Sequence, residues 1–219
     1  MREPPGSHVF EAGAHVGDHL LPMAAAFPSL RFVGLDPDAS KCAFIERMAD
    51  ANRLRNVRVV TAALDAVERT DCGLDRAGLP GMWRVGSNGT EEGLCTTIDA
   101  VMANATTIAV VHLDLEGFEF RAMLGANATL SRAPNVVFEN DHGDDPDGVV
   151  AHLTTLGFTK LDEVEHNEHW GRREVDDGDD GGGDDDDDDD VTEAPTPQRG
   201  GERQRAQRLR ARSRASPLP

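Results

Sequence analysis

Residues 9–19 read VFEAGAHVGDH, a short apolar run that leads into Gly13 and Gly17. The pattern is typical of a strand that turns into a helix, because glycines permit a tight turn and a close approach of a ligand to the backbone. Further along, residues 31–37 read RFVGLDP, a second strand that ends at Asp36. A carboxylate at this place holds ribose hydroxyls in dinucleotide-binding folds. The two segments predict an adenosine-containing ligand at the carboxyl edge of a parallel sheet.

The rest of the first 173 residues continues this rhythm of apolar strands and helix-length segments. Strands are predicted at 8–12, 31–35, 57–62, 108–113, 135–139, 158–164 and 169–174. Helices are predicted up to residue 27, after a cap at Asp38 or Ser40, and at 97–103, 118–130 and 147–156. The Gly-rich stretch 65–96 is predicted to be irregular, with 82–85 and 93–97 paired as a small hairpin. The expected fold is α/β and Rossmann-like, a mostly parallel sheet with helices on both faces.

The two ends of the chain differ in composition. Residues 7–173 have the composition of one folded domain, whereas residues 174–219 are an Asp/Gly run followed by an Arg-rich segment. The second part has too little apolar surface to offset the entropy of ordering it, so it is predicted to be a disordered tail. The formal net charge of the whole chain is −18, which argues against nonspecific binding of nucleic acid.

The cysteines and the apolar runs bear on location. Cys42, Cys72 and Cys95 are odd in number and form no CxxC pair, so neither a zinc site nor a disulfide framework is suggested. The sequence shows no secretory leader and no apolar run long enough to cross a membrane. A cytoplasmic location without stable membrane insertion is therefore expected.

The glycine loop also distinguishes between cofactors. A nicotinamide fingerprint requires a glycine where His15 stands, because that glycine lets a pyrophosphate come close. S-adenosylmethionine has no pyrophosphate and tolerates a side chain there. Its cationic sulfonium would also be attracted by Glu11 and Asp114. S-adenosylmethionine is therefore the predicted cofactor, and a nicotinamide-dependent oxidoreductase is a distant alternative.

These segments resemble the FkbM-type methyltransferases. The similar residues are VFEAGAHVGDH at 9–19, VGLDP at 33–37, TID at 97–99, HLDLEGFE at 112–119, LGA at 124–126 and VVFE at 136–139. The resemblance spans about residues 8 to 165. It implies a class I methyltransferase fold, S-adenosylmethionine as cofactor, and methylation of a hydroxyl on a sugar or another small molecule.

Candidate site residues follow from these patterns. The predicted cofactor-binding residues are Glu11, Gly13, His15, Gly17, Asp36, Pro37, Ala63, Leu64 and Asp114. The predicted catalytic residues are Asp114, Glu116 and His142, any of which could take a proton from the acceptor hydroxyl. Glu116 is expected to begin the helix that follows, and Glu119 to be structural. No metal ligand is predicted.

A competing interpretation is a cofactor-binding domain that has lost catalysis, or a scaffold acting through its charged tail. Three departures from the family pattern keep it open. His15 stands where Asn is usual, His112 stands where Lys is usual, and only residues 1–7 precede the first predicted strand. The identity of the acceptor and the oligomeric state are left open by the sequence.

Overall fold

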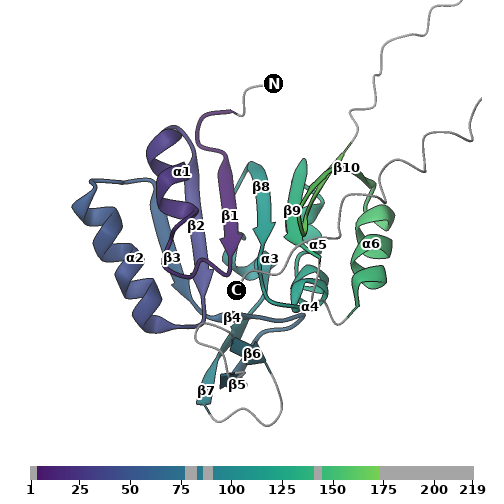
Figure 1. The fold of residues 1–219 in the computed structure, drawn as a ribbon, viewed down its shortest axis with the longest axis horizontal. Coiled ribbons are helices and arrows are strands. Elements are labelled where there is room, and N and C mark those ends of the chain that lie inside the picture. Colours follow the sequence, from purple (N-terminus) through teal and green to yellow (C-terminus); the bar gives the residue numbers. More distant parts are fainter. Residues whose placement is uncertain (1–3, 77–82, 86–90, 141–144, 173–219) are drawn as a thin grey trace, which may run out of the picture. The chain divides into compact units, whose positions relative to one another are not determined.

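The computed structural model describes residues 4–76, 83–85, 91–140 and 145–172. Its larger sheet has seven strands in the order β10-β11-β9-β8-β1-β2-β3 (Figure 1). These strands are β1 (His8–Ala12), β2 (Arg31–Asp36), β3 (Val57–Thr61), β8 (Ile108–Leu113), β9 (Asn135–Glu139), β10 (Phe158–Val164) and β11 (Asn167–Arg172). Strand β11 runs antiparallel to both of its neighbours, and the pairs from β3 to β9 are parallel. The expected Rossmann-like α/β fold is confirmed.

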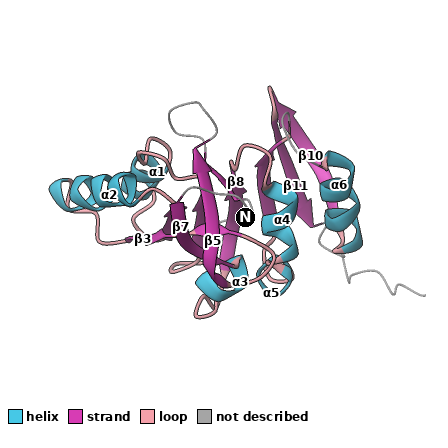
Figure 2. Ribbon diagram, turned by 90° about the horizontal axis from the view of Figure 1, so that it is seen from below, coloured by secondary structure: helices cyan, strands magenta, loops and turns pink. Residues whose placement is uncertain are grey.

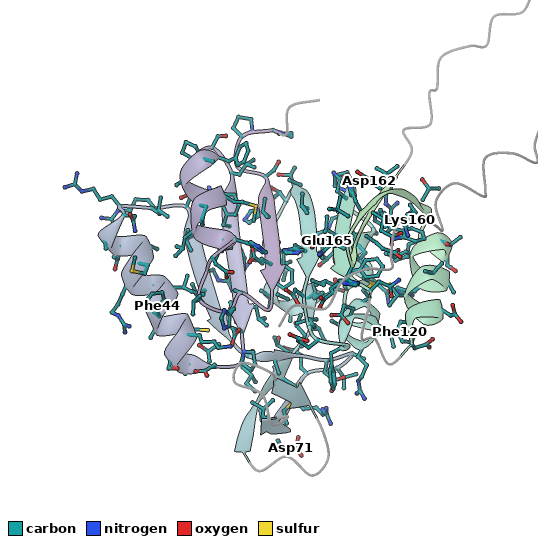
Figure 3. The ribbon with its side chains drawn as sticks, viewed as in Figure 1. Phe44, Asp71, Phe120, Lys160, Asp162 and Glu165 are labelled. Atoms are coloured by element: carbon teal, nitrogen blue, oxygen red, sulfur yellow. A yellow bond between two sulfur atoms is a disulfide. The ribbon has the colours of Figure 1, made fainter. Side chains whose placement is uncertain are left out.

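Helices cover both faces of this sheet (Figure 2). They are α1 (Leu20–Ala26), α2 (Ala39–Ala51), α3 (Ile98–Val101), α4 (Glu119–Leu124), α5 (Asn127–Leu130) and α6 (Pro146–Thr155). Alternate residues of β1 serve the two faces: Phe10 belongs to the larger buried cluster, which α3, α4, α5 and α6 cover, and Val9 belongs to the cluster beneath α1 and α2. Phe44 lies on the outer side of α2 and is exposed (Figure 3).

The chain order creates a switch point beside β1. The chain moves outward from β1 to β2 and β3, and then returns to β8 on the other side of β1. Ligands of open α/β sheets bind outside the carboxyl ends of the strands at such a point. Both the Gly13 loop and Asp36 lie at this edge, at the ends of β1 and β2.

A second, four-stranded sheet occupies the stretch predicted to be irregular. Its strands β4 (Ala63–Leu64), β5 (Arg69–Arg76), β6 (Trp83–Val85) and β7 (Glu91–Thr96) lie in the order β4-β7-β5-β6. The predicted hairpin between 82–85 and 93–97 is wrong, because β5 lies between β6 and β7 and pairs with both. Figure 1 shows this sheet at the edge toward which β1 and β8 point.

The helix predicted at 118–130 is divided into α4 and α5 at Gly125. A Cβ atom at Gly125 would lie 2.6 Å from the carbonyl oxygen of Asp65, so only glycine fits at this position. Asp99 then caps α5, because its carboxylate accepts hydrogen bonds from the N–H groups of Ala128 and Thr129. The capping carboxylate is remote in sequence, which explains why the local pattern of apolar residues did not reveal the break.

The cysteine pattern suggested no disulfide framework, but the structure contains one disulfide. Cys72 on β5 and Cys95 on β7 are bonded, with their Cα atoms 5.5 Å apart, and Cys42 is free and buried. Disulfides persist mainly in oxidising compartments, so this pairing does not support the expected cytoplasmic location. Among the described residues, no helix combines the length and apolar character needed to cross a membrane.

Candidate functional site

The glycine loop after β1 is fixed by contacts with the ends of β2 and β8. The N–H groups of Gly13 and Ala14 both donate to the carbonyl oxygen of Leu35, each at 3.0 Å. Gly13 has a φ of +80°, and a Cβ atom there would overlap the carbonyl oxygen of Asp114. Glycine is therefore required at position 13 by the close packing of the loop on the chain after β8, before any ligand is considered.

His15 occupies a backbone conformation that suits few side chains. Its φ is +46°, in the left-handed region where Asn, Asp and His are enriched among residues other than glycine. This explains how His can stand where related sequences usually have Asn. The His15 side chain is exposed and lines the same hollow as Glu11 and Asp36.

Asp36 connects the loop to the end of β2. Its two carboxylate oxygens accept hydrogen bonds from the backbone N–H groups of His15, at 3.0 Å, and Asp38, at 2.8 Å. The Lys41 ammonium lies 3.9 Å away. Burial is the largest influence on this carboxyl group and raises its pKa above the ordinary value. Each oxygen still has a second lone pair, so Asp36 can accept ribose hydroxyls as well. Of the two predicted caps, Asp38 or Ser40, the structure shows Asp38, whose side chain accepts from the N–H groups of Ser40 and Lys41.

Two adjoining hollows form a groove at this edge, because they share Gly13, Asp36, Asp114 and Glu116. The more apolar hollow is also lined by Leu35, Pro37, Ala63, Leu64, Leu74, Leu115 and Phe118. The more polar one is also lined by Glu11, His15, Asp18, His19, Lys41 and His112. The structure therefore brings together all the predicted cofactor-binding residues except Gly17. Gly17 instead forms the turn before α1, with a φ of +78°.

The small sheet closes the apolar side of the groove. Ala63 and Leu64 of β4 and Leu74 of β5 line it. The buried Asp65 follows β4 and fixes this sheet to α4, because its carboxylate pairs with Arg69 and lies 2.6 Å from an Arg121 nitrogen. Leu74 was not predicted, since its segment carries no local pattern that indicates a ligand.

Acidic side chains gather where the chain leaves the neighbouring strands β8 and β9. Asp114 and Glu116 line both hollows, and Glu139 ends the neighbouring strand β9. Burial, followed by the charges of Asp114 and Glu116, raises the pKa of Glu139 to about 7. Glu139 was not among the predicted site residues, although its place at a strand end beside β8 is a signal that could have found it. His142 lies outside the described residues.

Glu116 does not begin a helix, as the sequence had suggested. It has a φ of +52° and lies in the turn before α4, which begins at Glu119. The helix dipole therefore does not act on Glu116 as expected, because that effect is confined to the first turn. Non-glycine residues in this conformation cluster at active sites and ligand clamps. Glu119 has the structural role expected of it: its buried carboxylate accepts a 2.7 Å hydrogen bond from the N–H of Leu115.

The strand order, the antiparallel β11 and the groove beside β1 define a Rossmann-like domain of the class I methyltransferase type. The family model described as "Methyltransferase FkbM domain" matches residues 11–160. The chain belongs to this methyltransferase family, as the resemblance of its motifs had implied.

Solved structures with similar folds are remote in sequence. Precorrin-6y C5,15-methyltransferase from Geobacter metallireducens is 12% identical, with a TM-score of 0.47 over 77% of this chain and 80% of that one. SMU.1697c, a putative methyltransferase from Streptococcus mutans in complex with SAH, is 10% identical, with a TM-score of 0.48 over 77% and 90%. The magnesium protoporphyrin IX methyltransferase of Synechocystis PCC 6803 with bound SAH is 13% identical, with a TM-score of 0.45 over 77% and 75%. No curated protein matches the sequence. The family assignment rests on the family model and the strand order.

Proposed function

We propose that this domain binds S-adenosylmethionine in the groove beside β1 and transfers its methyl group to a hydroxyl oxygen of a small molecule. The observation that carries the proposal is the convergence of Gly13, Asp36 and Asp114 on one groove at the switch point of a methyltransferase fold. Structures of the methyltransferases from Streptococcus mutans and Synechocystis contain SAH, the demethylated form of the same cofactor.

The groove fits this cofactor in three respects. Asp36 is buried at the end of β2 and can accept the ribose hydroxyls. The apolar lining at Ala63, Leu64 and Leu74 suits the adenine ring. His15 replaces the glycine that a dinucleotide's pyrophosphate needs, and its N–H is already bonded to Asp36. These features favour the methyl donor over a nicotinamide cofactor.

When bound, S-adenosylmethionine supplies an electrophilic methyl group on a sulfonium. The acceptor oxygen forms a bond to the methyl carbon as the carbon–sulfur bond breaks, and the electron pair of that bond stays on sulfur. The hydroxyl proton must pass to a base. Asp114 and Glu116 line both hollows of the groove, and Glu139 lies beside Asp114; each of the three could take that proton in its ionised form. His142 stays a further candidate for the base.

Calorimetric titration of the full chain with SAH, and separately with NAD, tests the cofactor. One equivalent of SAH is expected to bind, and NAD is expected not to bind. The acceptor is then sought by offering sugars and other hydroxylated small molecules together with S-adenosylmethionine and measuring SAH release. Binding of NAD but not SAH would overturn the proposal. Binding of SAH with no turnover on any acceptor would support the competing interpretation, a domain that binds the cofactor without catalysis.

A further inference from the structure

A further cluster of chemically active side chains lies in the more polar hollow of the groove, on the face of the sheet that α1 covers. Glu11 on β1 pairs in register with His112 on β8, so their side chains project from the same face. His19, at the residue before α1, lies near both: its ring centroid is 6.0 Å from that of His112. One ligand atom from each of the three side chains can be chosen so that all lie within 4.8 Å of one another.

Glu11 supplies a second, independent observation. The residue is 3% exposed, and its Oε2 atom has no hydrogen-bond partner among the described residues. A buried acceptor without a donor lowers the stability of the fold, and more so when it is charged. The charges that act on this carboxyl group come from Asp18 and Asp114, which are also acidic. A bound cation would satisfy the orphaned oxygen and offset the accumulated negative charge.

We propose that Glu11, His19 and His112 bind a divalent transition-metal ion of the Zn²⁺ type. Two imidazoles and one carboxylate are ligands that suit Zn²⁺, whereas Mg²⁺ and Ca²⁺ favour sites made of oxygen alone. Three protein ligands leave a fourth position of a tetrahedral ion open to a water molecule or to a ligand in the groove. This proposal departs from the expectation from the sequence, which named no metal ligand.

The geometry requires only a small adjustment. Zinc–nitrogen bonds of about 2.0–2.1 Å place tetrahedral ligand atoms roughly 3.4 Å apart. This spacing is shorter than the 4.8 Å within which the three ligand atoms lie in the structure. Glu11 and His112 are held by adjacent strands, and His19 is exposed, so rotation of the His19 side chain can close the site. All three residues line the polar hollow of the proposed cofactor groove, so the metal titration is carried out without cofactor.

The experiment titrates the full chain with ZnCl₂ by calorimetry after removal of metal with a chelator, and repeats the titration with MgCl₂. His19→Ala and His112→Ala are compared with wild type. His166→Ala, in the exposed turn between β10 and β11, is the matched control. Because residues 184–190 are all Asp and can bind Zn²⁺ weakly, the decisive quantity is the difference between variants. The visible absorption of the Co²⁺-loaded protein reports whether nitrogen ligands are present.

One tight equivalent of Zn²⁺ is expected in wild type and in His166→Ala, with no comparable binding of Mg²⁺. His19→Ala and His112→Ala should each weaken Zn²⁺ binding by at least the roughly 10–100-fold that follows loss of an outer-shell partner. His19 is exposed, so its variant tests the site without disturbing the core. Failure of wild type to bind Zn²⁺, or equal binding by His19→Ala, would overturn the metal site and leave the proposed methyl transfer untouched.

Discussion

The backbone N–H of His15 donates a 3.0 Å hydrogen bond to the carboxylate of Asp36, which joins the glycine loop to the end of the neighbouring strand. Asp36 therefore has two tasks, to hold the loop and to offer lone pairs to a ribose. Its replacement by alanine removes both. We expect Asp36→Ala to weaken SAH binding by about 1–3 kcal/mol, through loss of charge-assisted hydrogen bonds. Calorimetric titration with SAH measures the change.

The control for this prediction is Asp50→Ala. Asp50 is an exposed acid whose pairing with Arg55 is at the surface, so its removal changes the net charge equally without touching the groove. Its affinity for SAH should match that of wild type. Wild-type affinity in Asp36→Ala would remove Asp36 from the cofactor site.

The left-handed backbone of His15 leads to a second prediction. Asn adopts this conformation readily, whereas a β-branched residue does not. His15→Asn should leave the free energy of unfolding nearly unchanged, and His15→Val should lower it by about 1–2 kcal/mol. Urea denaturation measures both. Equal stability of the two variants would show that the loop relaxes around the new side chain.

The Cys72–Cys95 bond should contribute measurably to stability. It spans a sequence separation of 23, and a loop of that size is expected to stabilise the folded state by about 3 kcal/mol. Thiol titration under denaturing, non-reducing conditions should find one free thiol, that of Cys42. Cys72→Ser should lower the melting temperature and abolish the effect of a reducing agent on it. Three free thiols in protein purified under oxidising conditions would contradict this bond.

The raised pKa of Glu139 predicts a pH dependence of stability. The folded state holds the proton up to about pH 7, whereas the ordinary pKa is 4.5, so between these values the folded state binds more protons. Stability should therefore rise as the pH falls from above 7 toward 4.5. Glu139→Gln should raise the melting temperature at pH 8 and change it little near pH 4.5.

In Glu139→Gln, the stability of the protein should depend less strongly on pH. Some dependence should remain, because the pKa of Glu11 is raised to about 7 as well, chiefly by burial. Glu163→Gln is the matched control, since Glu163 is an exposed acid on β10 that pairs with Lys160 (Figure 3 labels the lysine). An unchanged pH profile in Glu139→Gln would show that Glu139 titrates normally in the folded protein.

The parts of the fold that could be predicted from the sequence are those set by the local pattern of apolar and polar residues. The strands at His8–Ala12, Ile108–Leu113 and Asn135–Glu139 begin and end where predicted, because apolar runs bounded by polar or small residues specify a buried strand without further information. The glycine loop and Asp36 were predictable for the same reason. Both follow such strands directly, and the ends of adjacent parallel strands meet.

The features that escaped prediction depend on residues remote in sequence. The small sheet and its disulfide require β5 to lie between β6 and β7. These segments are rich in glycine and charged residues, so they show no regular alternation of apolar and polar residues that would predict the pairing. The meeting of Glu11, His19 and His112 follows from strand register, with His112 far along the chain from the other two. Glu116 has a left-handed backbone in the turn before α4, and the helical pattern of the residues that follow does not reveal it.

The last prediction concerns which carboxylate removes the acceptor's proton, and it rests on the proposed function. Removal of the base acts on the transition state, so it should lower turnover with little effect on SAH affinity. We expect Glu116→Gln to reduce turnover by about a hundredfold, at the lower end of the 10²–10⁴-fold range of general-base catalysis. Asp114→Asn should reduce both turnover and SAH affinity, because Asp114 packs against Gly13 in the loop that is proposed to hold the cofactor.

Glu139 adds an independent test through pH. With a pKa of about 7, it is protonated in acid and ionised in base, so a mechanism that uses it as the base loses rate as the pH falls below 7. Glu139→Gln should then remove both the rate and that acid limb. Glu116→Gln should lower the rate and keep the limb, shifted to lower pH, because the charge of Glu116 no longer raises the pKa of Glu139. Turnover is measured as SAH release with an acceptor found in the screen. Full activity in all three variants would exclude these carboxylates as the base and direct attention to His142, which could take a proton near neutral pH.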